Sequence, residues 1–127
     1  MAKLGMHKDV AAPYELVLAR LPDLLKAEGF GLVSEIDVAA TLKQKIGVDF
    51  RKYRILGACN PKIAHEVLQR VPDAGVLLPC NVAVYEQGTG TVVTAVDPLE
   101  TLAAARPELT DLAQDARGRL ARVLERL

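Results

Sequence analysis

A glycine-rich turn in the second half of the chain constrains the fold more than any other feature of the sequence. Gln87-Gly88-Thr89-Gly90 lies between two apolar segments, residues 75–85 and 91–96. Two strand-like segments joined by so short a turn predict a β-hairpin, whose strands are antiparallel. A doubly wound parallel sheet requires strands and helices to alternate strictly, so the hairpin disfavours that architecture.

The rest of the chain alternates between strand and helix periodicity. Apolar residues at helical spacing predict helices over residues 12–28, 38–46, 61–71 and 107–127, and period-two patterns predict strands over residues 3–7, 30–37 and 51–58. Together with the hairpin, this order predicts one α+β domain over residues 1–127. We expect a mainly antiparallel sheet of about five strands with helices packed on one face.

Three local features sharpen this expectation. Pro22 removes a backbone donor inside the first helix, so we expect a kink there or the start of a second helical piece. Pro79 lies inside the longest predicted strand, where proline is tolerated only at an edge or a bulge. Alternation over residues 30–37 predicts a half-buried strand, with Phe30, Leu32 and Ile36 on one side.

Composition excludes several classes of partner. The 16 basic and 16 acidic residues balance, so electrostatics give no reason to expect nucleic acid or an anionic membrane. Aromatic residues make up only 4% of the chain, which disfavours a stacking platform for bases. No apolar run is long enough to cross a bilayer, and the first five residues lack the apolar core of a signal peptide. We therefore expect a cytoplasmic protein with reduced cysteines.

Two short segments carry the residues best suited to chemistry. Each contains a Cys-Asn pair, Cys59-Asn60 before Pro61 and Cys80-Asn81 after Pro79. Asn60-Pro61 is a strong helix start, with Asn60 as the capping side chain. The positive end of a helix stabilises a thiolate, so Cys59 is the candidate catalytic nucleophile or redox centre.

Cys80 has a different expected environment. It is an even number of residues from Leu78, Val82 and Val84, so the four side chains should share one face of the strand. We expect this face to point toward the core, with Cys80 as a small buried hydrophobic residue. If the strands over residues 51–58 and 75–85 are neighbours, the two thiols could meet, share a metal or form a transient disulfide. Two thiolates are fewer than the four ligands usual for structural zinc.

The other ionisable residues give weaker signals. Glu35 and Asp37 share one face of a strand, an arrangement suited to acid–base work, but Asp37 is also placed to cap the next helix. His65 falls on the flank of a helix and is expected at the surface. Patterns of the common hydrolases, nucleotide-binding loops and zinc proteases do not occur in the sequence.

Three segments together resemble a known family. They are residues 28–37, with Glu35 and Asp37, residues 53–61, with Gly57, Cys59, Asn60 and Pro61, and residues 77–82, with Leu78, Pro79, Cys80 and Asn81. In this order they resemble the bacterial and archaeal domain-of-unknown-function family 302. The resemblance implies a curved antiparallel sheet like that of the TATA-binding-protein class, and a homodimer. It implies neither DNA binding nor any reaction.

Three functions follow as hypotheses. The first is a small homodimeric binding module in which Cys59, Asn60, Cys80, Asn81 and Glu35 line a site for a small molecule or a soft metal. The second is a thiol-dependent enzyme or redox protein that uses Cys59, for which the sequence offers no clear base. The third is a structural or interaction protein in which both Cys-Asn pairs serve only capping and packing.

Overall fold

A computed structural model describes residues 4–127 of the chain. The strands are β1 (Met6–Val10), β2 (Gly31–Asp37), β3 (Tyr53–Cys59), β4 (Cys80–Gln87) and β5 (Gly90–Ala95), and the α-helices are α1 (Tyr14–Ala27), α2 (Val38–Ile46), α3 (Pro61–Arg70) and α4 (Thr110–Glu125). Shorter helical segments are the 3₁₀ helices η1 (Pro72–Leu77) and η3 (Pro107–Leu109) and the π-helical turn η2 (Leu99–Ala103). The five strands form one open sheet in the order β1-β5-β4-β3-β2, and every neighbouring pair is antiparallel. The predicted α+β class is therefore confirmed.

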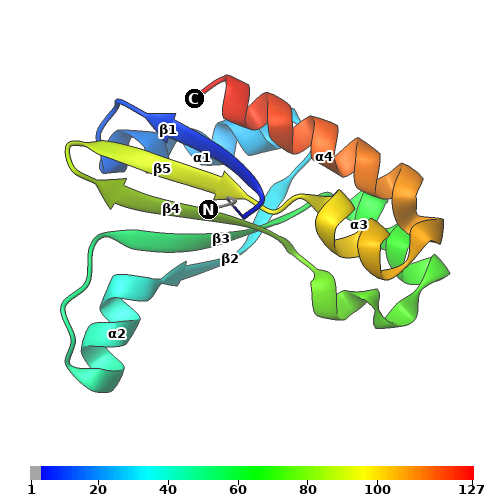
Figure 1. Cartoon of the computed structure of the whole chain (residues 1–127), viewed down its shortest axis with the longest axis horizontal. Coiled ribbons are helices and arrows are strands. Elements are labelled where there is room, and N and C mark those ends of the chain that lie inside the picture. Colours follow the sequence, from blue (N-terminus) through cyan, green and yellow to red (C-terminus); the bar gives the residue numbers. More distant parts are fainter. Residues whose placement is uncertain (1–3) are drawn as a thin grey trace.

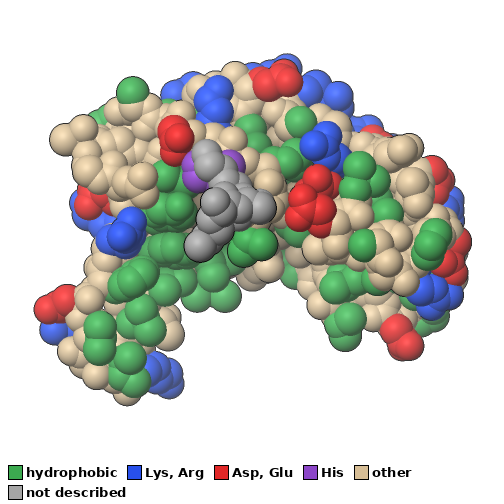
Figure 2. All heavy atoms as spheres, viewed as in Figure 1, with side chains coloured by type: hydrophobic (Ala, Val, Ile, Leu, Met, Phe, Trp, Pro, Cys, Tyr) green, Lys and Arg blue, Asp and Glu red, His purple; other side chains and the backbone are tan. Residues whose placement is uncertain are grey.

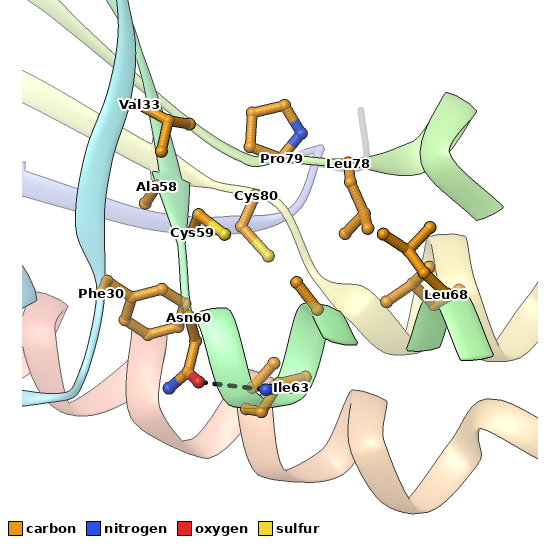
Figure 3. Close-up of a pocket in the computed structure, with 13 residues that line it drawn as sticks. Phe30, Val33, Ala58, Cys59, Asn60, Ile63, Leu68, Leu78, Pro79 and Cys80 are labelled. Atoms are coloured by element: carbon orange, nitrogen blue, oxygen red, sulfur yellow. Dashed lines mark hydrogen bonds between the residues drawn. The ribbon is translucent and has the colours of Figure 1, made fainter. Parts of the chain in front are cut away.

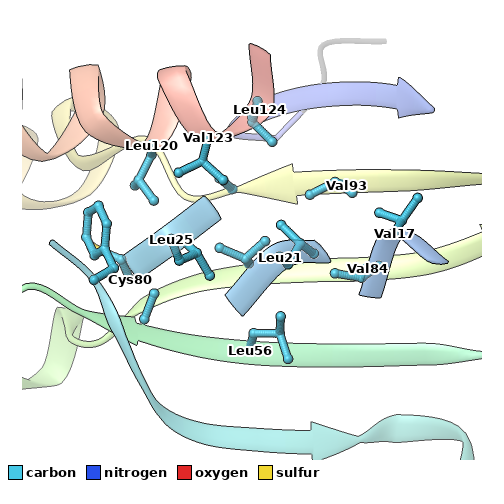
Figure 4. Close-up of a cluster of buried hydrophobic side chains, with 14 of the residues drawn as sticks. Val17, Leu21, Leu25, Leu56, Cys80, Val84, Val93, Leu120, Val123 and Leu124 are labelled. Carbon is cyan, nitrogen blue, oxygen red and sulfur yellow. The ribbon is translucent and has the colours of Figure 1, made fainter. Parts of the chain in front are cut away.

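The main core lies between one face of the sheet and two helices, α1 and α4 (Figure 1). Leu21 and Leu25 of α1 and Leu120 of α4 pack against Leu56 and Val84 of the central strands, and all five are almost fully buried (Figure 4). Burying each of these side chains contributes roughly 1.5–3 kcal/mol, so this layer supplies much of the stability.

A second, smaller core joins α3 and η1 to η2 and the start of α4. Val67, Leu109 and Ala113 are its most deeply buried members. The chain therefore has two apolar clusters, and α4 takes part in both.

The hairpin forms as the sequence predicts. Gln87 pairs with Gly90, and Gly88 takes the positive φ of 60° that glycine adopts without strain. Asp37 and Asn60 also cap α2 and α3 as expected, since their side-chain oxygens accept hydrogen bonds from Ala40 N at 2.9 Å and Ile63 N at 3.2 Å.

The predicted strand over residues 75–85 is wrong in its first half. Residues Pro72–Leu77 form the 3₁₀ helix η1, and β4 begins only at Cys80. Pro72 stands at the first position of η1, where its missing N–H costs nothing. Pro79 precedes β4, after a cis peptide bond with Leu78, and so removes no hydrogen bond from the ladder.

The strand predicted over residues 30–37 forms as β2, but its predicted half-buried character is wrong. β2 is an edge strand, and apart from the partly buried Asp37 all its residues are exposed. The pairing with β3 shifts register between Leu32 and Ser34, so Val33 forms a bulge. The bulge breaks the alternation that placed Leu32 and Ile36 on one side. Phe30, just before the strand, is buried.

Three further expectations change only locally. α1 runs through Pro22 without interruption, so no second helix begins there. The last helix is divided, because η3 precedes α4. The first strand was expected over residues 3–7 and is Met6–Val10, and Lys3 lies outside the described residues. In the part of the chain that the structure describes, no helix has the length and apolar character needed to cross a membrane.

The sheet face opposite α1 and α4 carries apolar side chains from its central and edge strands. Ile36 pairs with Ile55, Ile55 pairs with Ala83, and Tyr53 stacks on Tyr85 with ring centroids 5.2 Å apart. We call these five residues the open face. Next to it, α2 projects as an arm without a buried residue. Figure 2 shows apolar side chains lining the hollow under the sheet and continuing onto this arm.

Candidate functional site

The two Cys-Asn pairs meet where β3 ends and β4 begins. Ala58 pairs with Cys80 in the antiparallel ladder, so Cys59 is one residue from direct register with Cys80. Both sulfur atoms point into one cleft above α3 (Figure 3). The cleft has a volume of about 300 Å³. We call it the thiol cleft; it is lined by Phe30, Val33, Ala58, Cys59, Asn60, Ile63, Ala64, Leu68, Leu78, Pro79, Cys80, Leu102 and Ala116.

The thiol cleft lies between the two apolar cores. Phe30, Ala58 and Cys80 belong to the core under the sheet, whereas Leu102 belongs to the smaller one. The space remains open because α3 does not pack fully against the sheet. Among the apolar residues of α3 only Val67 is buried, and Leu68 is exposed.

The two thiols have different surroundings. Cys80 is buried, as its parity predicts, and Cys59 is half-buried. Both are free, so neither forms a disulfide. Burial raises the pKa of the Cys80 thiol to about 11, and the neighbouring Cys59 adds to this rise by like-charge repulsion. Cys80 is therefore a neutral thiol at physiological pH, and Cys59 is the more accessible of the two.

Asn60 holds the end of the cleft in place. Its Oδ1 accepts the hydrogen bond from Ile63 N at the start of α3. Its Nδ2 lies against Gly29, where an added Cβ would stand only 2.8 Å from that nitrogen. Gly29 also has a φ of +84°. Glycine is needed there both for the backbone conformation and for the close approach of Asn60.

Gly57 has a comparable role beside the thiols. A Cβ added to Gly57 would lie 2.9 Å from Pro79 Cγ and would also collide with the side chain of Ser34. The absence of a side chain lets Pro79 lie against β3 and brings Cys80 into the ladder next to Cys59.

Two predicted site residues lie elsewhere. Glu35 accepts a hydrogen bond from Arg54 at 3.1 Å, and Asp37 pairs with the same guanidinium at 3.3 Å. Burial acts to lower the pKa of Arg54, but Asp37 and Glu35 together raise it. Neither carboxylate lines the thiol cleft. Asn81 is exposed, and it lines a groove on the other side of the sheet with Ile55 and Thr94. Alternation along β4 causes this separation, because Cys80 and Asn81 must point to opposite faces.

Most of the cleft wall was not assigned to a site from the sequence. Ile63, Ala64 and Leu68 lie at helical spacing within the helix predicted over residues 61–71, and this spacing indicates only an apolar helix face. The apolar face of α3 is wider than the area that packs against other elements, so part of it is left to line the cleft. How much is left depends on how α3 packs against its neighbours, which the sequence of the helix does not specify. Val33 reaches the cleft from the β2 bulge, for which the sequence gives no signal.

Among side chains, the donor atoms of the cleft are limited to two sulfurs and one amide. No His, Asp or Glu is among its lining residues, and His65 is exposed on α3. Within residues 4–127 no three such side chains or cysteines cluster in a way that could hold a metal ion. The thiol cleft therefore offers apolar contact and two soft donors, and it lacks a carboxylate or imidazole that could act as a base.

Comparison with known proteins assigns the family. A family model described as a domain of unknown function, DUF302, matches residues 6–127. The chain belongs to the DUF302 family. Its fold is also similar to a crystal structure of an uncharacterized conserved DUF302 protein from Bacillus stearothermophilus, with 34% sequence identity, 98% of each chain covered and a TM-score of 0.89. A search of curated proteins finds no match.

The match to the DUF302 family confirms the family resemblance that the segments around Glu35, Cys59 and Cys80 indicated. It brings no reaction or ligand, because DUF302 is a family of unknown function. The function of this DUF302 chain must therefore be argued from the cleft itself.

Proposed function

We propose that this DUF302 chain is a small binding module whose ligand site is the thiol cleft. The observation that carries the proposal is the convergence of the only two cysteines of the chain in one apolar cleft of about 300 Å³. Ligand sites are typically concave and mostly apolar, with few polar groups. The ligand is a small molecule with a mainly apolar surface that contacts the two sulfur atoms.

The other two hypotheses have less support. A thiol-dependent enzyme needs a base near its nucleophile, and no ionisable side chain other than the cysteines lines the cleft. A purely structural role would account for the buried Cys80 and for the Asn60 cap, but it gives no reason for an open apolar cleft beside Cys59. We also propose a cytoplasmic location, which the two free thiols support.

Titration with indole, a small and mainly apolar probe, tests the proposal. We expect saturable NMR shift changes at the backbone amides of Cys59, Ile63 and Cys80. Ala64→Leu fills the cleft and should abolish them. Gln69→Leu adds the same side chain at an exposed position of α3 outside the cleft and should leave them unchanged. No saturable change at these amides, or equal changes in both variants, would reject the cleft as a binding site.

We further propose that the chain forms a homodimer through the open face and the α2 arm. An α-helix of nine residues has little stability of its own, and α2 buries none of its residues within the chain. Ile36, Ile46, Val48 and Phe50 are large exposed apolar residues on or next to this surface. A second copy would cover them, and the absence of net charge on the chain removes one source of repulsion between copies.

A further inference from the structure

The donor atoms of the thiol cleft select one chemical class of ligand. Sulfur from Cys59 and Cys80 is present, and the only other polar side chain in the lining is the amide of Asn60. The Oδ1 of that amide already accepts the hydrogen bond from Ile63 N. Among the side chains of the cleft, the two sulfur atoms are therefore the ligands that remain for an ion.

This donor set excludes the common hard and borderline cations. Calcium and magnesium take six or more oxygen ligands, and the cleft has no carboxylate. Zinc in structural sites takes four ligands, usually with cysteine or histidine, and no cluster of three such side chains exists within the described residues. Soft monovalent copper prefers thiolate sulfur, and two such ligands can satisfy it.

The surroundings fit a soft ion of low charge. The cleft wall is almost entirely apolar, which limits the water available as a competing ligand. Two thiolates and one monovalent ion carry a net charge of about −1. This charge would lie near the start of α3, because the helix begins at Pro61, two residues after Cys59. The positive end of the α3 dipole therefore lies next to the sulfur that would carry part of this charge.

We infer that Cys59 and Cys80 form a two-coordinate site for a soft monovalent cation of the copper(I) class. The inference rests on the proposed function, because it requires the thiol cleft to be open to ligands. Each thiol that binds the ion releases its proton to solvent and forms one sulfur–metal bond, and no oxidant or reductant takes part.

Anaerobic titration of the reduced protein with copper(I), against a colorimetric copper(I) chelator, tests the inference. We expect one ion per chain, a thiolate-to-copper absorption band and protection of Cys59, the more accessible thiol, from iodoacetamide. Zinc(II) should give neither protection nor retention after dialysis. Equal retention of zinc(II), or copper(I) retained without protection of Cys59, would overturn the inference.

Variants assign the ligands. Cys59→Ala and Cys80→Ala should each weaken copper(I) binding by more than about 100-fold, since even loss of an outer partner of a metal ligand costs 10–100-fold. Alanine keeps position 80 apolar, so the core should fold, and circular dichroism checks this. His65→Ala removes the imidazole on α3 and should leave the affinity unchanged. Unchanged affinity in either cysteine variant would overturn the two-sulfur site.

The indole titration separates failure of this inference from failure of the proposed function. If copper(I) is not retained but indole still shifts the amides of the cleft, the metal site is wrong and the binding module stands. If neither indole nor copper(I) binds and Cys59 resists iodoacetamide until the chain is unfolded, the cleft is closed and both proposals fail.

Discussion

The thiol of Cys80 is removed from water by the core under the sheet, and this burial raises its pKa from 9.0 to about 11. In the unfolded chain the same thiol would ionise near its ordinary value. Between these pH values the unfolded state therefore binds fewer protons than the native state at this position. The resulting stabilisation is fully present below pH 9 and is lost as the pH rises toward 11.

We predict that Cys80 lowers the free energy of unfolding by roughly 2–3 kcal/mol as the pH rises through this window. Urea denaturation of the wild type and of Cys80→Ala between pH 8 and 11, about the range spanned by the two pKa values, measures the effect. The variant should show a smaller fall. Cys59→Ala should keep most of the wild-type fall in stability, because burial contributes more than Cys59 to the raised pKa of Cys80. Parallel curves for wild type and Cys80→Ala would contradict the buried neutral thiol.

At the scale of elements, the thiol cleft depends on how α1, α3 and β4 are joined to the sheet. Gly29 ends the turn after α1 and leaves room for the side chain that caps α3. Gly57 leaves room on β3 for the proline before β4. These two positions without side chains therefore let the elements that carry the cysteines pack closely together.

We predict that Gly29→Ala destabilises the protein by about 1–3 kcal/mol, because alanine would be strained at the φ of +84° and would displace the Asn60 cap. Gly118→Ala is the matched control. It lies inside α4 with only the end of Arg122 nearby, so alanine should stabilise the helix by up to about 1 kcal/mol. Urea denaturation measures both variants. Loss of stability in both, or in neither, would show that the α1–α3 junction is not controlled by Gly29.

At the scale of the whole molecule, the chain has one sheet face covered by its own helices and one that carries apolar side chains without such cover (Figures 1 and 2). The surface reaches the β2 edge of the sheet, where Ile36 is 48% exposed. An apolar edge strand is prone to pairing with another chain unless it is protected. This surface is the reason for the proposed homodimer.

We predict that sedimentation analysis gives a dimer for the wild type and that Ile36→Lys shifts it toward monomer by at least tenfold in dissociation constant. Val76→Lys is the control, since Val76 is 87% exposed but lies on η1, away from the open face. It should remain dimeric. A monomeric wild type would reject the dimer, and dissociation of both variants would reject the open face as the interface.

The sequence by itself determined the features that depend on neighbouring residues. The turn at Gln87–Gly90 required a hairpin, Asp37 and Asn60 marked helix starts, and the parity of Cys80 placed it in the core. Each rests on backbone chemistry or periodicity within about ten residues. The same local patterns carried the resemblance that the family match over residues 6–127 confirmed.

Only the tertiary structure decided which residues share a site. The extent of β4 and the bulge at Val33 depend on pairing across the sheet, for which the sequence has no local signal. Glu35 was expected beside the cysteines, but it faces Arg54 in another part of the sheet. The cleft itself is space left between two cores by the packing of α3, so its walls come from segments distant in sequence. Such a space is a property of how elements fit together, and periodicity within one element cannot specify it.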